Sequence, residues 1–148
     1  MAQKDKELLL KDLCARLPYN VKVKVECGDI PYAPTILSKL DIKRKVALFN
    51  FEVRIENCKP YLRPMSSMTE EEKNELTEMT ITSPNLETAA VLFRERYYEE
   101  EPQWRNDWAI CSLPKVLNWL NAHHFDYRGL IEKGLAIAVT EENNPYKE

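Results

Sequence analysis

The two histidines of the chain are adjacent, and they are the first candidates for chemistry. His123 and His124 are followed by Asp126, so one loop would offer two ligands to a metal ion. A metal site usually needs three or four ligands, and the others would have to come from residues such as Cys111 or Glu132. The simpler interpretation is that one histidine caps the preceding helix, where a cation is favoured, while the other packs or is solvated. We therefore expect no metal and no cofactor.

Thiols are the second candidates, because a cysteine beside a histidine base is a potential nucleophile. Cys58 or Cys111 would have to pair with one of the two histidines, but neither lies in a nucleophile elbow or a protease signature. Cysteine is among the residue types that are most often buried, so structural thiols are the simpler interpretation. We expect no catalytic residue. A small metal-dependent or cysteine hydrolase at the His-His loop remains an alternative function.

Basic residues form the third candidate site. They are Lys22, Lys24, Lys43, Arg44 and Lys45. Together with Tyr19 and Tyr32 they would bind single-stranded nucleic acid through phosphate contacts and base stacking. The competing interpretation is a solubilising strand face whose lysines guard a sheet edge. Because the whole chain has a net charge of −3, and nucleic-acid-binding proteins usually carry a basic excess, a nucleic-acid-binding accessory protein is the second hypothesis.

Aromatic residues crowd the C-terminal half, and aromatic side chains dominate the energetics of many protein interfaces. They are Tyr97, Tyr98, Trp104, Trp108, Trp119, Phe125 and Tyr127. Trp119 lies beside Leu120 on a predicted helix and is expected in the core, whereas Trp104 lies in a charged loop and is the candidate for an exposed anchor. No catalytic or metal constellation is complete. The first hypothesis is therefore a non-enzymatic interaction protein that binds another protein through its aromatic and acidic C-terminal half.

The hydrophobic pattern predicts the elements that position these residues. Apolar residues at four-residue steps predict a helix at Asp5–Leu17, with Asp12 outside its apolar stripe. Val21–Cys27 and Val46–Ile55 alternate between apolar and polar residues and are expected to be strands. Shorter strands are expected at 35–40 and 108–112, and a last strand or an extended arm at 135–139.

A capping box marks the start of a second helix. In the segment Thr69-Glu70-Glu71-Glu72, the Thr69 hydroxyl can accept a hydrogen bond from the Glu72 amide, and the Glu72 carboxylate can return one. The helix is expected to continue to about Met79. Further helices are expected at 86–98 and 112–122, and loops at 59–67 and 123–134.

Length and composition indicate one globular domain. The chain has 148 residues, of which 44% are hydrophobic and 30% charged, so we expect a single domain over 1–148 with a frayed tail at 141–148. The element pattern predicts an α+β fold, an antiparallel sheet of three to five strands with helices packed on one face. The start is charged, no apolar run is long enough to span a membrane, and the cysteines lack CxxC spacing. We therefore expect a soluble cytoplasmic protein with reduced thiols and no membrane partner, while its oligomeric state is left open.

Three blocks of the sequence carry a resemblance to known proteins. They read KELLLKDLCARLPY at 6–19, KPYLRPMSSMTEEE at 59–72 and WLNAHHFDYRGLIEKGLA at 119–136. The chain resembles short uncharacterised proteins that are carried by prophages and mobile elements of gut anaerobic bacteria. The blocks cover less than a third of the chain, and the stretch 80–112 does not share the likeness. The resemblance implies a small cytoplasmic accessory protein, phage-borne in its context, and brings no activity or catalytic residue with it.

Two of these blocks contain polar and aromatic loops that would form one surface if they met in space. The residues of this surface are Tyr61, Arg63, His123, His124, Asp126, Tyr127 and Arg128. An ion pair between Asp126 and Arg128 would pin the turn, and Gly129 could adopt a positive φ. With Trp104, these residues are the candidate binding site for a partner protein.

Overall fold

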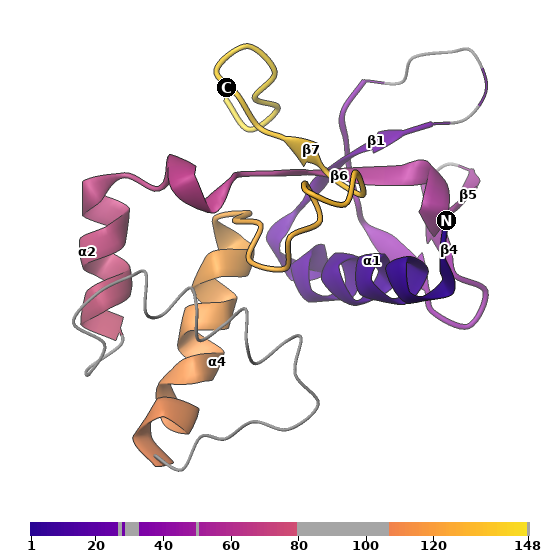
Figure 1. The fold of residues 1–148 in the computed structure, drawn as a ribbon. Coiled ribbons are helices and arrows are strands. Elements are labelled where there is room, and N and C mark those ends of the chain that lie inside the picture. Colours follow the sequence, from indigo (N-terminus) through magenta and orange to yellow (C-terminus); the bar gives the residue numbers. More distant parts are fainter. Residues whose placement is uncertain (27, 29–32, 50, 80–106, 148) are drawn as a thin grey trace. The chain divides into compact units, whose positions relative to one another are not determined.

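The computed structural model describes residues 1–26, 28, 33–49, 51–79 and 107–147, which fall into two compact units (Figure 1). The first unit consists of Met1–Arg63 and Gly129–Glu148, and the second of Pro64–Arg128. Each unit has a hydrophobic cluster of its own. The prediction of one domain over 1–148 stays a prediction. None of the helices in the described ranges is long and apolar enough to cross a membrane.

The first unit begins with the helix that the leucine pattern predicts. Helix α1 spans Gln3–Arg16, and a short 3-10 turn, η1 (Leu17–Tyr19), follows it. The leucine stripe of α1 is buried in the same cluster as the strand residues Val23 and Cys58. Asp12 differs from the expectation, because it is buried on this helix instead of lying outside the apolar stripe.

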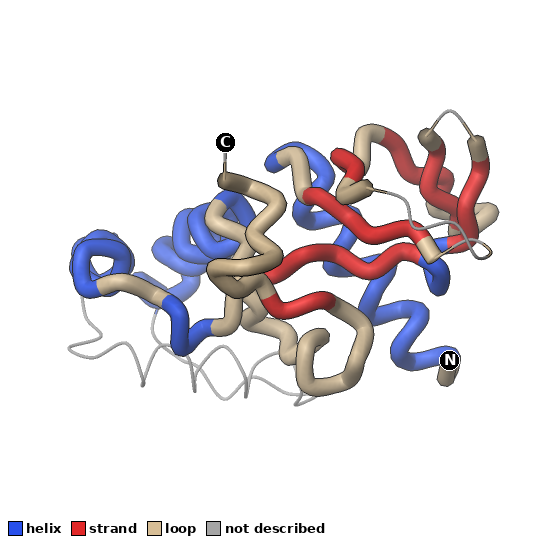
Figure 2. Tube along the Cα trace, turned by 90° about the horizontal axis from the view of Figure 1, so that it is seen from above, coloured by secondary structure: helices blue, strands red, loops and turns tan. Residues whose placement is uncertain are grey.

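Four strands form the main sheet of the first unit, in the order β2-β1-β6-β7 (Figure 2). They are β1 (Lys22–Val25), β2 (Thr35–Ile36), β6 (Cys58–Leu62) and β7 (Ile137–Ala138). Strand β1 pairs antiparallel with both β2 and β6, whereas β6 pairs with β7 in parallel. Helices combined with mostly antiparallel sheets confirm the predicted α+β class.

Strand β6 lies where a loop was expected, and this part of the prediction is wrong. Pro60 and Pro64 suggested irregular backbone, since proline cannot donate to a strand ladder. The pairing with β7 begins only after Pro60, at Tyr61, so the proline faces no strand residue on that side. Burial of most of β6 in the core of the unit stabilises the strand despite the proline.

A second sheet has the order β3-β4-β5, and it corrects the predicted strand at Val46–Ile55. Its strands are β3 (Lys39–Asp41), β4 (Val46–Leu48) and β5 (Glu52–Arg54). The single strand expected at Val46–Ile55 is in fact a hairpin, in which Ala47 pairs with Val53 and both are buried. The apolar alternation continues through both arms, so periodicity alone does not reveal the reversal. After β5 a 3-10 turn, η2 (Ile55–Asn57), leads into β6.

The second unit contains the short turn η3 (Met65–Ser67) and the helices α2 (Glu70–Met79) and α4 (Asp107–Ala122). The capping box is confirmed: the Glu72 amide donates to Thr69 Oγ1 at 3.2 Å, and the Thr69 amide donates to Glu72 Oε2 at 2.9 Å.

Helix α4 begins earlier than expected, so the strand predicted at 108–112 is wrong. A short apolar run fits a strand or a buried helix equally well, and here it continues the helix. The buried cluster of this unit contains Met68, Leu76, Val116, Trp119, Leu120, Phe125 and Tyr127. The helix expected at 86–98 lies outside the described residues.

Candidate functional site

The histidine pair ends helix α4. His124 has a φ of 60°, its amide donates to the Asn121 carbonyl, and the Phe125 amide donates to the Leu120 carbonyl. These two bonds and the left-handed residue form a Schellman motif, the usual way in which a helix ends. His123 adds a ring contact, since its Nδ1 lies 2.9 Å from the Trp119 carbonyl oxygen. The geometry thus agrees with the capping interpretation of the histidines.

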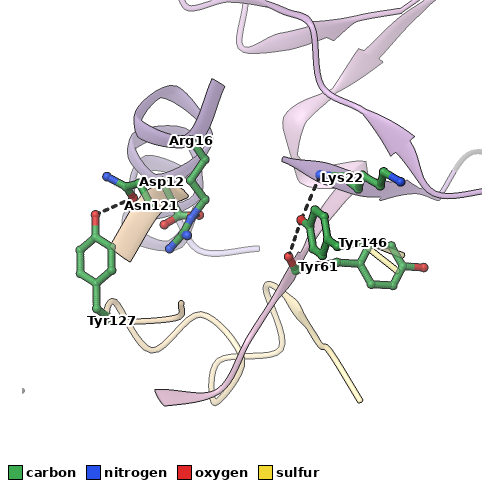
Figure 3. A network of polar contacts seen from close by, with 7 residues as sticks. All are labelled: Asp12, Arg16, Lys22, Tyr61, Asn121, Tyr127 and Tyr146. Carbon is green, nitrogen blue, oxygen red and sulfur yellow. Dashed lines mark hydrogen bonds and ion pairs between the residues drawn. The ribbon is translucent and has the colours of Figure 1, made fainter. Parts of the chain in front are cut away.

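The loop after the histidines is largely interior. His124, Asp126, Tyr127 and Arg128 are each 8% exposed or less. The Tyr127 hydroxyl donates to Asn121 Oδ1 at 2.9 Å (Figure 3), and the Arg128 guanidinium carbon lies 4.6 Å from the centre of the Tyr127 ring. His123 stacks on Trp119 with ring centres 4.0 Å apart. Trp119 and Tyr127 belong to the core of the second unit, and His124, Asp126 and Arg128 are buried as well, so the surface predicted from these side chains is mostly not accessible.

The remaining candidates of this surface lie elsewhere. Tyr61 is buried in strand β6 and Arg63 is half-buried just after it, and both belong to the first unit. The meeting of the two loops stays a prediction. Trp104 lies outside the described residues.

Two of the basic candidates lie on strand β1. Lys22 Nζ donates to the Pro145 carbonyl at 2.6 Å, and Lys24 Nζ lies 4.0 Å from Glu26 Oε1. Lys22 is therefore held by the C-terminal tail.

The other basic candidates lie in the turn between β3 and β4. Arg44 donates to both carboxylate oxygens of Glu52, with Nη1 at 2.8 Å from Oε1. This contact raises the pKa of Arg44 and lowers the pKa of Glu52. Lys43 is exposed, and Lys45 is half-buried with a φ of 52°. Neighbouring acids thus offset part of the predicted basic patch, which weakens its case as a phosphate-binding surface.

The described thiols are poor nucleophiles. Burial raises the pKa of Cys58 to about 12, and its Sγ lies 3.7 Å from the Arg54 carbonyl oxygen. Burial also raises the pKa of Cys14. A thiolate is the reactive form of cysteine, so these shifts oppose nucleophilic chemistry at neutral pH. Among the described residues, no group of three or more His, Cys, Asp or Glu side chains is placed to hold a metal ion.

A polar site around Tyr146 was not predicted from the sequence, and it lies in the tail that was expected to fray. The Lys22 amide donates to the Tyr146 oxygen at 3.1 Å, and the Tyr146 hydroxyl donates to the Tyr61 carbonyl at 2.9 Å (Figure 3). Burial raises the pKa of Tyr146 to about 12. The contact joins residues that are 124 and 85 positions apart, so no local pattern could have revealed it.

A buried ion pair lies on helix α1 in the same unit. Arg16 Nε donates to Asp12 Oδ2 at 2.8 Å, and both side chains are 0% exposed. The charge of Arg16 lowers the pKa of Tyr146 and that of Asp12 raises it, although burial is the larger effect. The pair therefore lies within electrostatic reach of the tyrosine hydroxyl. Its four-residue spacing could have predicted the ion pair, but not its burial.

Exposed apolar side chains gather in one stretch of the first unit. Ile36 is 44% exposed, Ile42 60% and Phe51 42%. Ile36 lies on the edge strand β2 of the four-stranded sheet. Ile42 follows the edge strand β3 at the Val46 end of β4, and Phe51 precedes the edge strand β5 at the Leu48 end. We call Ile36, Ile42 and Phe51 the hairpin surface.

Comparison of the chain with protein-family models, with curated proteins and with solved structures finds no match. What the chain can do must therefore be argued from its own geometry. Its described histidines end a helix and its described thiols are held neutral, while the first unit offers exposed apolar side chains at sheet edges.

Proposed function

We propose that this protein is a non-enzymatic accessory protein that binds another protein through the hairpin surface. The observation that supports the proposal is the exposure of Ile36, Ile42 and Phe51 within one short stretch of the first unit. Single exposed apolar residues are ordinary, whereas larger exposed apolar patches mark interaction sites, and the proposal is that these three side chains belong to one such surface. The cytoplasmic location and the phage-borne context that the resemblance implies belong to the same proposal.

The edge strands beside this surface could bind a partner by pairing with an extended segment of it. Strands β3 and β5 are the edges of the three-stranded sheet, and β2 is an edge of the four-stranded sheet in the described part of the chain. An extended peptide can add a strand to an edge of this kind, with backbone hydrogen bonds for affinity and side-chain contacts for specificity.

Charge indicates the chemistry of the partner. Residues 33–54 contain five basic and two acidic residues, a net charge of +3, whereas the whole chain carries −3. Lys39, Lys43 and Arg54 are exposed, although Arg54 Nη1 lies 3.7 Å from Glu56 Oε1. A partner segment that combines acidic and apolar residues would complement this surface.

This proposal moves the contact surface away from the C-terminal half that the sequence favoured. Trp119, Phe125 and Tyr127 of that half are buried. Trp104 remains the one candidate anchor there that the described residues do not cover.

Substitution of the hairpin surface tests the proposal. Tagged wild-type protein and the double variant Ile42→Ser, Phe51→Ser are used to capture partners from a lysate of the native host, with nuclease present. Exposed residues are chosen, so the fold should be retained, and Glu75→Ser on the exposed face of α2 serves as the matched control. Truncation of an interface hot spot weakens binding by about thirtyfold, so the double variant should lose a partner that the control retains.

Two outcomes would contradict the proposal. Equal capture by the wild type and the double variant would show that the hairpin surface is not the contact. A wild-type complex that forms only without nuclease, and that weakens steeply with salt, would favour the nucleic-acid hypothesis instead.

A further inference from the structure

The antiparallel ladder between β1 and β6 is interrupted at one step. Val25 pairs with Cys58, Lys24 with Lys59 and Val23 with Pro60, so the next pair in register would be Lys22 with Tyr61. At that step the Tyr146 hydroxyl accepts from the Lys22 amide and donates to the Tyr61 carbonyl. A side chain thus stands in for one main-chain hydrogen bond, as Figure 3 shows.

The tail that delivers this hydroxyl is ordered by its own turns. The Thr140 amide donates to Asn143 Oδ1 at 2.7 Å, and the Asn143 amide donates to Thr140 Oγ1 at 3.3 Å. The Tyr146 amide donates to Asn144 Oδ1 at 2.9 Å. Because β7 pairs with one side of β6 and Tyr146 inserts on the other, the tail crosses β6 to reach its site.

Lys22 recognises the residue before the tyrosine as well as the tyrosine itself. Its Nζ donates to the Pro145 carbonyl at 2.6 Å and lies 5.9 Å from the centre of the Tyr146 ring. Its backbone amide meanwhile binds the hydroxyl. One residue of β1 therefore contacts a Pro-Tyr pair at three points.

The chemistry of the gap selects tyrosine. The inserted group must accept from an amide and donate to a carbonyl at the same oxygen, which a hydroxyl can do and a phenylalanine cannot. Serine and threonine carry a hydroxyl but lack the reach of a ring. Pro145 and Tyr146 lie in a turn, and proline restricts the backbone there because its ring fixes φ.

We propose that the gap between Lys22 and Tyr61 is a docking slot for the tyrosine of a Pro-Tyr turn of a partner protein, and that the tail fills this slot as an internal competitor. Release of the tail leaves the Lys22 amide and the Tyr61 carbonyl available to the incoming hydroxyl. Lys22 pairs with Ile36 of the hairpin surface, so the slot lies beside that surface, but the proposal rests on its own observations.

Tethering sets how strongly the tail competes. A segment joined by a short linker has an effective concentration on the order of millimolar. A free segment of equal intrinsic affinity therefore binds the wild type weakly and binds a chain with an emptied slot much better.

A binding measurement with the full chain tests the slot. The probe is a fluorescein-labelled peptide of residues 140–147, and a second peptide carries phenylalanine in place of Tyr146. Both are titrated by anisotropy against the wild type and against Tyr146→Ala. We expect the tyrosine peptide to bind Tyr146→Ala about tenfold or more tightly than the wild type, and the phenylalanine peptide to bind the variant at least about fivefold more weakly than the tyrosine peptide.

Equal affinity of the tyrosine peptide for both proteins, equal affinity of the two peptides, or no binding at millimolar peptide would overturn the proposal. Amide exchange provides a second readout in Tyr146→Phe, which keeps the ring and removes only the hydroxyl. The Lys22 amide should exchange at least about tenfold faster in this variant, since it loses its acceptor, and the tyrosine peptide should slow it again. An exchange rate that the peptide leaves unchanged would also count against the slot.

Discussion

Removal of one partner of the buried ion pair on α1 should destabilise the protein strongly. Asp12 and Arg16 are both 0% exposed and lie 2.8 Å apart. Replacement of Asp12 by Ala leaves the guanidinium in the core without this carboxylate, which typically costs about 3 to 5 kcal/mol of unfolding free energy. For a chain of this length, a loss of about 3 kcal/mol corresponds to a fall in Tm of about 10 °C.

Replacement of both partners by apolar residues of similar size should cost far less. In the double variant Asp12→Leu, Arg16→Met neither charge of this pair remains, and the new side chains join the apolar cluster around Leu9 and Leu13. Exchanges of this kind are often neutral or even stabilising. The double variant should therefore lie within about 1 kcal/mol of the wild type, although Asp12→Ala alone does not.

Urea denaturation followed by far-UV circular dichroism measures these differences, because α1 contributes to the signal. Glu52→Gln serves as the control, since it removes one partner of the exposed pair with Arg44 and should leave the midpoint nearly unchanged. If Asp12→Ala shifted the midpoint no more than Glu52→Gln does, the argument from burial would be refuted.

Three further predictions follow from individual contacts. Thr69→Ala removes the acceptor of the Glu72 amide and should cost about 1 kcal/mol in urea denaturation, whereas Thr69→Ser should cost little; equal losses would contradict the capping box. The folded-state pKa of Tyr146 is about 12 against an ordinary 10, so the stabilisation of its neutral form is present below pH 10 and is lost as pH rises from 10 to 12. The wild type should accordingly lose about 2 kcal/mol more than Tyr146→Phe over that window in alkaline urea denaturation, and parallel losses would contradict the assignment. Cys58 should resist iodoacetamide at pH 8 in the native protein and react once urea unfolds it, as peptide mass mapping can show; rapid native labelling would contradict its burial.

Local rules predicted the elements whose signals are local. The leucine steps of α1 and the capping box of α2 each lie within a few residues, and the structure confirms both. The α+β class could be predicted because the sequence contains both helical and strand periodicities. By contrast, the hairpin of β4 and β5 keeps one alternation through both arms, so its reversal depends on the pairing of Ala47 with Val53. Strand β6 was not predicted, because Pro60 indicated a loop. The strand accommodates this proline because its pairing with β7 begins one residue later.

The candidate sites depended still more on long-range contacts. The capping interpretation of the histidines could be made from their place after a helix, and the geometry of His124 agrees with it. The burial of Tyr127 and Arg128 could not be foreseen, because polar loop residues are usually exposed. The role of Tyr146 depends on contacts with β1 and β6 that only the folded chain brings together.

Photo-crosslinking from the hairpin surface tests the central claim most directly. A photoreactive phenylalanine analogue replaces Phe51 in the full chain, and the same analogue at Glu75 provides the matched control in the native host. The account predicts a protein adduct of defined mass from position 51 that is absent from position 75, and that Ile42→Ser reduces. Adducts of equal pattern from both positions, or an adduct from 51 that nuclease removes, would contradict it.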